Sequence, residues 1–277
     1  MNYVLKIYCD DEKGLVYRIS DIIFKFSLNI LTNHEFVDHE KNKFFYRAEI
    51  YGENLDVNSL KSTLDAMLGG RAKIEIFEVS KKNIVILATK ETHCLGDLLI
   101  KHYSNELNAN ILAVIANHDD LRNLVEKFEI PFFCVKSENL SREEHEKELI
   151  KLLKNYEFDY IILAKYMRIL SDDFVSHFPQ KMINIHHSFL PAFIGANPYK
   201  QAYERGVKII GATAHFVTGD LDEGPIITQD VIRVNHEMSW QYMQRAGRNV
   251  ERNVLAAALD LVFDDRIFVY DNKTVIF

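Results

Sequence analysis

The sequence predicts an α/β protein of two parts, a small βαββαβ unit followed by a larger, doubly wound α/β domain. In the first 80 residues, short apolar strands alternate with segments whose apolar residues recur at helical spacing. After a polar linker the strands become solidly apolar, as expected of a parallel sheet that is buried on both faces. The length of 277 residues is also that of about two domains.

The six predicted elements of the first unit follow one another with short connections. They are the strands 2–8, 30–38, 44–51 and 72–79 and two helices, which begin at Leu15 and Val57. The polar residues 39–42 indicate a hairpin turn, and Gly69 and Gly70 end the second helix. The order is that of a split, ferredoxin-like fold.

Residues 1–79 resemble an ACT domain, a small regulatory module that often binds amino acids between paired copies. The resemblance lies in the turn 10–14, which ends in Gly14 and is followed directly by Leu15. It implies a regulatory or oligomerisation domain, with methionine and glycine as candidate effectors near residues 10–14 and 29–30. It also implies a homodimer or homotetramer. A ferredoxin-like module that serves dimerisation alone is the alternative.

The second domain is predicted over residues 83–277, after the linker 80–83. Its expected strands are 84–88, 111–116, 132–135, 160–164, 182–185, 209–217 and 226–234. Its expected helices begin near Leu95 and span 118–128, 142–155 and 239–262. This alternation predicts a doubly wound, Rossmann-like sheet, in which ligands bind outside the carboxyl ends of the strands.

The composition excludes several classes of protein. A formal net charge of −7 and a pI of about 5.9 argue against a nucleic-acid partner, which would need a basic face to displace phosphate counterions. The three cysteines form no CxxC pair, which indicates buried free thiols in a reducing compartment. The chain has neither a signal-peptide pattern nor the roughly 20 apolar residues of a membrane helix. We therefore expect a cytoplasmic protein with no membrane partner.

Polar residues gather where the strand 182–185 ends. Asn184 and His186 are two positions apart, so in extended chain both side chains point to the same side. Residues 189–198 follow, with two prolines and a glycine that predict a rigid surface loop rather than a helix or strand. The acidic loop 215–225, which contains Asp222, joins the next two strands and could form the opposite wall of a cleft.

An amide, a histidine and an aspartate suit acyl chemistry at a carbonyl group. The amide of Asn184 and a protonated His186 could stabilise an oxyanion, while Asp222 could orient or deprotonate water. Ser188 has no G-x-S-x-G elbow, so we interpret it as a hydrogen-bonding loop residue. His215 could support Asp222, or it could be a buried histidine bonded to the backbone.

The segments 184–191, 215–217 and 220–224 resemble the folate-dependent formyltransferase family, and the resemblance covers about residues 83–277. It implies a catalytic trio of Asn184, His186 and Asp222, with His187 and His215 in supporting positions. The segments 165–170 and 217–222 are similar to the parts of the family that enclose the pterin ring. The substrate-binding residues so implied are Met167, Arg168, Ile169, Leu170, Val217, Thr218, Gly219 and Asp220.

Three features point to the hydrolytic, deformylase branch of that family. An ACT-like domain precedes the formyltransferase-like domain, as in that branch. The segment 89–97 contains a single glycine and two acids, which makes a poor phosphate cradle. His187 stands where the glycinamide ribonucleotide enzymes have a proline. The chain also ends too soon for the C-terminal nucleic-acid domain expected of the transfer-RNA branch.

The resemblance implies hydrolysis of 10-formyltetrahydrofolate to formate and tetrahydrofolate. The formate would supply purine synthesis, and the reaction would balance the one-carbon folate pool. The folate is then the substrate, and no prosthetic group or metal is expected. Whether Asp222 or His186 accepts the first proton stays open at this point.

Three other functions are weighed against hydrolysis. A zinc hydrolase could use His186, His187, His215 and Asp222, but adjacent histidines in a strand point to opposite faces and no HExxH spacing is present. Formyl transfer to an amine such as glycinamide ribonucleotide would use the same trio. A non-catalytic sensor of folate and amino acids is the third alternative.

Arg168 could contact the anionic tail of folate or pair with a surface acid.

Overall fold

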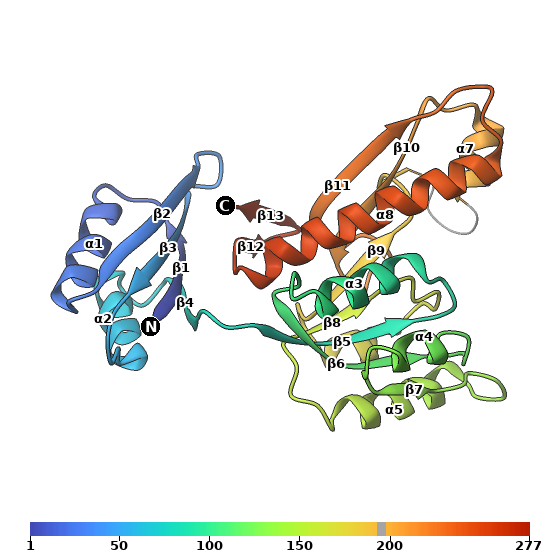
Figure 1. Ribbon diagram of the computed structural model, residues 1–277. Helices are drawn as coiled ribbons and strands as arrows, with labels where there is room; N and C mark the ends of the chain where they lie inside the picture. Colours follow the sequence, from blue (N-terminus) through green and yellow to red (C-terminus); the bar gives the residue numbers. More distant parts are fainter. Residues whose placement is uncertain (193–197) are drawn as a thin grey trace. The chain divides into compact units, whose positions relative to one another are not determined.

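The computed structural model describes residues 1–192 and 198–277, which divide into two compact units (Figure 1). Unit 1 comprises Met1–Ser80, Asp264–Phe268 and Val275–Phe277, and unit 2 comprises Lys81–Phe263 and Val269–Thr274. The expected second domain, 83–277, differs from unit 2 because parts of the C-terminal 14 residues belong to unit 1.

Unit 1 has the predicted βαββαβ order. Its elements are β1 (Asn2–Asp10), α1 (Leu15–Lys25), β2 (Asn29–Asp38), β3 (Lys43–Tyr51), α2 (Val57–Met67) and β4 (Lys73–Glu78). The strands form an antiparallel sheet in the order β2-β3-β1-β4. Buried residues of the two helices, such as Ile19 and Leu64, pack with Leu5 and Ile50 of the sheet into one core.

The other face of this sheet carries two buried cations, whose partners come from the end of the chain. Lys6 donates a hydrogen bond of 2.6 Å to the carbonyl oxygen of Ile267, and Arg47 donates one of 2.8 Å to that of Asp264. The ring of Phe268 packs edge-on against Phe45. These carbonyl groups explain how Lys6 and Arg47 can be buried, because a buried charge requires polar partners.

Unit 2 is built on a seven-stranded sheet in the order β11-β10-β9-β8-β5-β6-β7. The strands are β5 (Lys82–Ala88), β6 (Ala109–Ala116), β7 (Phe132–Cys134), β8 (Tyr160–Leu163), β9 (Met182–His186), β10 (Ile209–Phe216) and β11 (Ile226–Arg233). The five strands β5 to β9 are parallel, and β10 and β11 extend the sheet with antiparallel pairs. The predicted α/β sheet is therefore confirmed, with an antiparallel edge.

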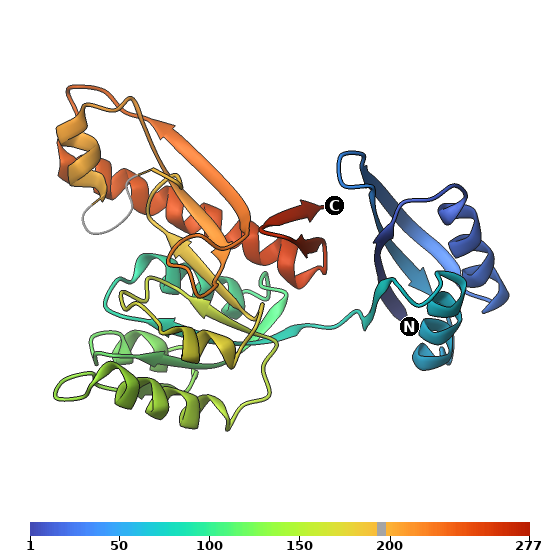
Figure 2. The same cartoon turned by 180° about the vertical axis from the view of Figure 1, so that it is seen from behind.

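Helices cover both faces of this sheet, as Figures 1 and 2 show from opposite sides. They are α3 (His93–Tyr103), α4 (Arg122–Glu126), α5 (Arg142–Leu153), α6 (Asp172–Ser176), α7 (Pro198–Arg205) and α8 (Trp240–Phe263). Residues of α5 and α6 share one core with alternate residues of β5 and β8, whereas α8 packs against β9, β10 and β11 and against α3. The carboxyl ends of the parallel strands stay free for a site.

Several local predictions were wrong. The helix expected over 118–128 is only α4, because residues 118–121 form a turn in which Asp119 accepts a hydrogen bond from the guanidinium group of Arg122. Residue 198 is not loop: Pro198 begins α7, where proline's missing N–H is no loss. The rest of the expected loop 189–198 lies partly outside the described residues.

Short elements were missed altogether. These are α6, which Ser171 caps with a hydrogen bond from the N–H of Phe174, and the paired strands β12 (Ile267–Tyr270) and β13 (Lys273–Ile276). Within the described ranges 1–192 and 198–277, no helix combines the length and the apolar character that crossing a membrane requires.

Candidate active site

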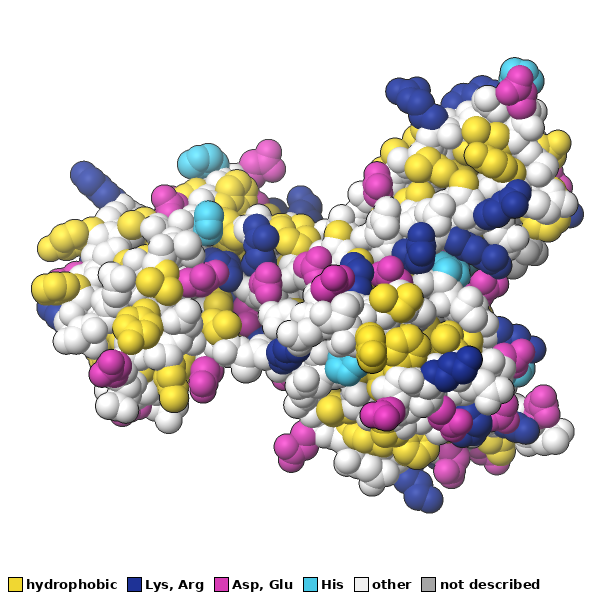
Figure 3. All heavy atoms as spheres, viewed as in Figure 1, with side chains coloured by type: hydrophobic (Ala, Val, Ile, Leu, Met, Phe, Trp, Pro, Cys, Tyr) yellow, Lys and Arg dark blue, Asp and Glu magenta, His cyan; other side chains and the backbone are white. Residues whose placement is uncertain are grey.

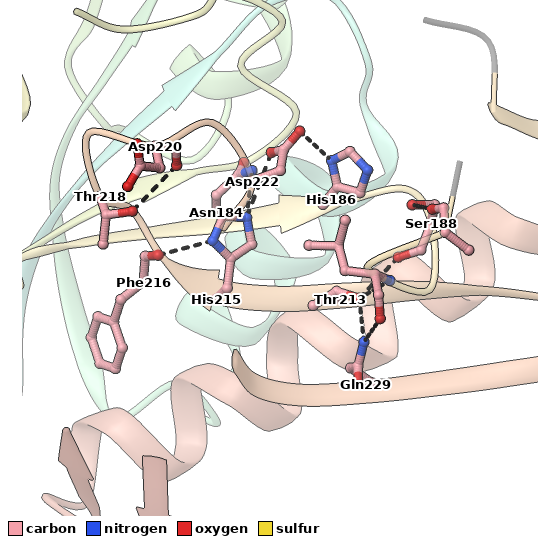
Figure 4. A network of polar contacts seen from close by, with 12 residues as sticks. Asn184, His186, Ser188, Thr213, His215, Phe216, Thr218, Asp220, Asp222 and Gln229 are labelled. Carbon is pink, nitrogen blue, oxygen red and sulfur yellow. Dashed lines mark hydrogen bonds and ion pairs between the residues drawn. The ribbon is translucent and has the colours of Figure 1, made fainter. Parts of the chain in front are cut away.

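A cleft of about 300 Å³ opens at the carboxyl ends of β8 and β9. All the residues that the sequence predicts for the site line it: Met167, Arg168, Ile169, Leu170, Asn184, His186, His187, His215, Val217, Thr218, Gly219, Asp220 and Asp222. Figure 4 shows the polar residues at its inner end. The structure therefore brings together segments that lie up to 55 positions apart in the sequence, from Met167 to Asp222.

Asn184 and His186 lie on β9, in the middle of the sheet. Their spacing of two places both side chains in the cleft, as the strand period predicts. His186 is buried, and its neighbour Ile185 pairs with Ala214 of β10. A rigid central strand thus holds the amide and the imidazole, which favours a fixed geometry at a reacting group.

Asp222 reaches the same point from the loop between β10 and β11. Its Oδ2 atom lies 3.3 Å from Nδ1 of His186, and its backbone has a positive φ of 58°. The loop folds back tightly, because a Cβ atom on Gly224 would lie 1.8 Å from the carbonyl oxygen of Phe216. Only glycine fits that approach, so the chain returns at a point that aims Asp222 at His186.

The electrostatics keep Asp222 ionised. Burial alone would raise the pKa of the carboxyl group, but the hydrogen bond from His186 and the nearby imidazoles outweigh it. The pKa of Asp222 therefore lies below its ordinary value. At neutral pH the site contains a carboxylate whose side chain is 11% exposed and which can accept a proton or orient water.

His215 connects the backbone to Asn184. Its Nδ1–H donates a hydrogen bond of 2.9 Å to the carbonyl oxygen of Phe216, so Nε2 is free to accept one of 3.2 Å from the amide of Asn184. Burial lowers the pKa of His215, which agrees with this neutral form. The same Nε2 atom lies 3.7 Å from Asp222. His215 is therefore both a buried histidine bonded to the backbone and a neighbour of Asp222, the two possibilities that the sequence left open.

One imidazole nitrogen of this group has no partner in the part of the chain that the structure describes. Nε2 of His186 is buried and makes no hydrogen bond within the described part of the chain, whereas Nδ1 faces Asp222. We call Asn184, His186, His215 and Asp222 the Asp222 cluster. It offers an amide N–H and an imidazole beside a carboxylate, which can stabilise an oxyanion and activate water at a carbonyl carbon.

The outer part of the cleft is apolar. Met167 and Ile169 are 56% and 58% exposed, and Thr89 fixes their segment by accepting a hydrogen bond of 2.9 Å from the N–H of Met167. Arg168 is half-buried beside them. Exposed apolar side chains with a few polar groups are typical of a site for a flat, organic ligand.

The loop after β9 is fixed by hydrogen bonds to β10 and β11. Thr213 accepts a hydrogen bond from the N–H of Leu190 and donates one to the carbonyl oxygen of Ser188, and Gln229 donates to both Thr213 and Leu190 (Figure 4). The hydroxyl group of Ser188 donates to the carbonyl oxygen of Ala192. The prediction that Ser188 is a hydrogen-bonding loop residue is confirmed.

A second buried carboxylate, which the sequence analysis missed, lies behind His187. Glu251 of α8 accepts hydrogen bonds from Tyr199 (2.6 Å) and His93 (2.8 Å), and the ammonium group of Lys165 lies 3.1 Å away. We call these four residues the Glu251 cluster. The sequence did contain a sign of this carboxylate: Glu251 is an acid on the apolar side of α8, next to Val250 and one turn before Val254 and Leu255.

The zinc alternative is not favoured by this geometry. The prediction that His186 and His187 point to opposite faces was wrong: β9 ends at His186, and the two ring centres lie 5.3 Å apart. Among the described residues, the group close enough to hold a metal is instead His93, Cys94 and Glu251. Burial raises the pKa of the Cys94 thiol, and Lys165 already occupies a place beside Glu251.

Comparisons with known proteins agree with this geometry. A family model described as formyl transferase matches residues 82–259. A curated formyltetrahydrofolate deformylase of Escherichia coli is 55% identical over 99% of this chain and 97% of its own length. The crystal structure of a formyltetrahydrofolate deformylase from Pseudomonas syringae matches with a TM-score of 0.95 and 40% identity, covering 100% of this chain and 94% of that one. A glycinamide ribonucleotide transformylase from Symbiobacterium toebii matches with a TM-score of 0.69 and 27% identity, covering 73% of this chain and 96% of that one.

Proposed function

The chain belongs to the formyl transferase family and, within it, to the formyltetrahydrofolate deformylases, and we propose that its Asp222 cluster is where the reaction takes place. The enzyme hydrolyses 10-formyltetrahydrofolate to formate and tetrahydrofolate. The observation that supports the proposal is the Nε2 atom of His186, which has no hydrogen-bond partner among residues 1–192 and 198–277, while Nδ1 of the same ring faces Asp222.

The proposed reaction is a direct attack of water on the formyl carbon. Asp222 orients the water and accepts its proton as the new carbon–oxygen bond forms. The N–H of Asn184 and the Nε2–H of protonated His186 stabilise the oxyanion. The bond from the formyl carbon to N10 of the folate then breaks, and N10 takes up a proton as tetrahydrofolate leaves.

We propose that the first proton goes to Asp222 rather than to His186. Asp222 is the anion of the pair, because its pKa lies below the ordinary value. His186 is more useful as a donor, because it lines the cleft and its Nε2 atom has no hydrogen-bond partner among the described residues. The trio supplies a base and two donors, so no prosthetic group is required in this mechanism.

The pterin ring of the folate is proposed to bind in the outer, apolar part of the cleft. Met167, Ile169 and Leu170 would contact one edge of the ring, and the loop of Val217, Thr218, Gly219 and Asp220 would cover the other. Arg168, which lines the cleft, is proposed to meet the anionic glutamate tail.

Further proposals concern regulation and metabolism. The βαββαβ order of unit 1 supports an ACT-like domain, with methionine or glycine as effector near the turn 10–14 and residues 29–30. A homodimer or homotetramer in the cytoplasm is the proposed assembly. The formate is proposed to supply purine synthesis and the hydrolysis to balance the one-carbon folate pool.

The experiment that tests the mechanism is formate release from 10-formyltetrahydrofolate with no amine present. Native enzyme should release one formate per folate, and Asp222→Asn should lower kcat by about a thousandfold or more, because the base is lost. Turnover that appears only after an amine is added would reject hydrolysis. A fully active Asp222→Asn variant would reject the role of Asp222 and leave the hydrolysis intact.

A further inference from the structure

A second cleft, of about 230 Å³, adjoins the folate cleft. The two share Lys165, Met167 and His187, and the second one is otherwise lined by Glu91 and by residues of α3, α7 and α8 such as Tyr199 and Glu251. A second substrate could approach the formyl group from this side. The residues between the two clefts therefore influence whether water or an amine attacks the formyl carbon.

Lys165 and His187 line both clefts, and Tyr199 contacts the ring of His187 from the second cleft; we call these three residues the wall. The ring of His187 neighbours two others, with centres 5.3 Å from that of His186 and 6.2 Å from that of Tyr199. Burial and the charge of Lys165 lower the pKa of His187 to about 3, so the ring is neutral and offers no carboxylate-like or cationic group to an incoming amine. The wall is thus a packed, uncharged ring pair with an ammonium group beside it.

The Glu251 cluster fixes this wall. Glu251 accepts from the hydroxyl of Tyr199 through one oxygen, and His93 and Lys165 occupy the other. Gly247 makes room for Tyr199, because a Cβ atom at that position would lie 2.2 Å from its hydroxyl oxygen. These three donors occupy most of the roughly four acceptor sites of the carboxylate, so little of Glu251's capacity is left to bind an amine.

The rim of the second cleft is also unfavourable to an amine. Lysine and arginine side chains follow the line of α8 in Figure 3, and Arg245, Arg248 and Arg252 lie on that helix. Arg248 lines the cleft, with Glu91 2.8 Å away as its counter-ion. The lining carries three cations, Lys165, Lys200 and Arg248, against the two carboxylates of Glu91 and Glu251. Its small net positive charge is unfavourable to a primary amine, itself a cation at neutral pH, but not to water.

We propose that Tyr199 and His187, fixed through Glu251 and Lys165, determine specificity by closing the amine side of the active site, so that water is the nucleophile. This inference rests on the proposed reaction at the Asp222 cluster. It assigns a role to four residues that take no part in that reaction. Opening the wall would let an amine attack the formyl carbon: a carbon–nitrogen bond forms, the bond to N10 breaks, and the amine's proton goes to N10.

The test measures how the formyl group partitions between two products. The enzyme is given 10-formyltetrahydrofolate and excess glycinamide, and N-formylglycinamide and formate are quantified by mass spectrometry, with the uncatalysed reaction subtracted. The native enzyme should form formate almost alone. Tyr199→Ala should raise the ratio of N-formylglycinamide to formate by about tenfold or more, the size of a steric discrimination in a pocket. Tyr199→Phe, which keeps the ring but frees Glu251, should give a smaller rise.

Two further variants sharpen the result. Gly247→Ala displaces the tyrosine without removing it and should also raise the ratio. The control is Tyr203, which lies on α7 like Tyr199 but is 45% exposed. Tyr203→Ala should leave the ratio unchanged. The ratio of the two products is measured per turnover, so partial unfolding of a variant does not change it. If a variant has no turnover at all, Tyr199→Phe decides the test.

The outcomes distinguish the inference from the reaction on which it rests. Formate production with an unchanged ratio in Tyr199→Phe, Tyr199→Ala and Gly247→Ala would overturn the wall and leave the hydrolysis standing. A native enzyme that forms no formate would overturn the reaction itself.

Discussion

Two carboxylates of unit 2 sit among imidazole rings, and they differ in how far their hydrogen-bonding capacity is used. The side chain of Glu251 is 1% exposed and takes hydrogen bonds or an ion pair from three donors. The side chain of Asp222 is 11% exposed, and its partner His186 has a buried nitrogen without a partner in the described residues. The ring of His187 contacts one member of each cluster, His186 and Tyr199.

The difference separates structural from catalytic polar groups. A buried polar group that is fully bonded holds its surroundings in one arrangement, and leaving it unbonded costs stability. A reacting group must keep a donor or acceptor for the substrate, so it stays incompletely bonded in the free enzyme. We therefore expect changes in the Asp222 cluster to affect mainly the rate, and changes in the Glu251 cluster mainly the stability and the choice of nucleophile.

After the loss of the base in Asp222→Asn, the largest effect should come from Asn184→Ala. The amide donates to the developing oxyanion, so its loss should lower kcat about a hundredfold to a thousandfold with little change in KM, as for other oxyanion donors. Steady-state formate release measures both constants. Ser188→Ala, which removes a hydroxyl that bonds only to the loop, is the matched control and should keep kcat close to native. A rise in KM at constant kcat would instead make Asn184 a binding residue.

The next effect is on stability. Glu251→Gln removes the counter-ion of the buried Lys165, which should lower the free energy of unfolding by about 3 kcal/mol. Asp222→Asn should lower it by only about 1 kcal/mol, the net value of an ordinary hydrogen bond. Urea denaturation of both variants measures the contrast. Equal losses would mean that the two clusters do not differ in the way described above.

A smaller effect is expected at His215, which joins the catalytic amide to the backbone. His215→Phe keeps the ring but removes the acceptor for Asn184, so kcat should fall about tenfold, or about 1.4 kcal/mol, through a misplaced amide. His215→Gln restores an acceptor and should recover part of the rate. A native kcat in the Phe variant would show that Asn184 needs no such support.

The parts of the site that could be predicted from the sequence are those fixed by local geometry. Asn184 and His186 share a face because a strand repeats every two residues, and Asp222 lies in a loop that a glycine folds tightly. The alternating elements of unit 2 follow equally from apolar strands and amphipathic helices.

The parts of the fold and of the site that the sequence did not predict depend on tertiary contacts. Tyr199 and His93 lie 52 and 158 positions from Glu251 in the sequence, so no local pattern links them. Tyr199 also needs the missing side chain at Gly247. The five-residue α6 and the strands β12 and β13 are too short to show a period, and the long helix expected over 118–128 gave way to a turn.

The smallest predicted effect is the pH dependence of the Glu251 cluster. Burial alone would raise the pKa of Glu251, but the hydrogen bond from His93, the charge of Lys165 and the hydrogen bond from Tyr199 lower it to about 2 from an ordinary 4.5. A carboxyl group with a depressed pKa stabilises the fold fully above its unfolded value, and this contribution is lost as the pH falls from 4.5 towards 2. Between pH 6 and pH 3.5 the native enzyme should therefore lose about 1 kcal/mol more unfolding free energy than Glu251→Gln does. Urea denaturation at the two pH values measures this, and equal losses in the two proteins would mean that the ionised Glu251 does not stabilise the wall.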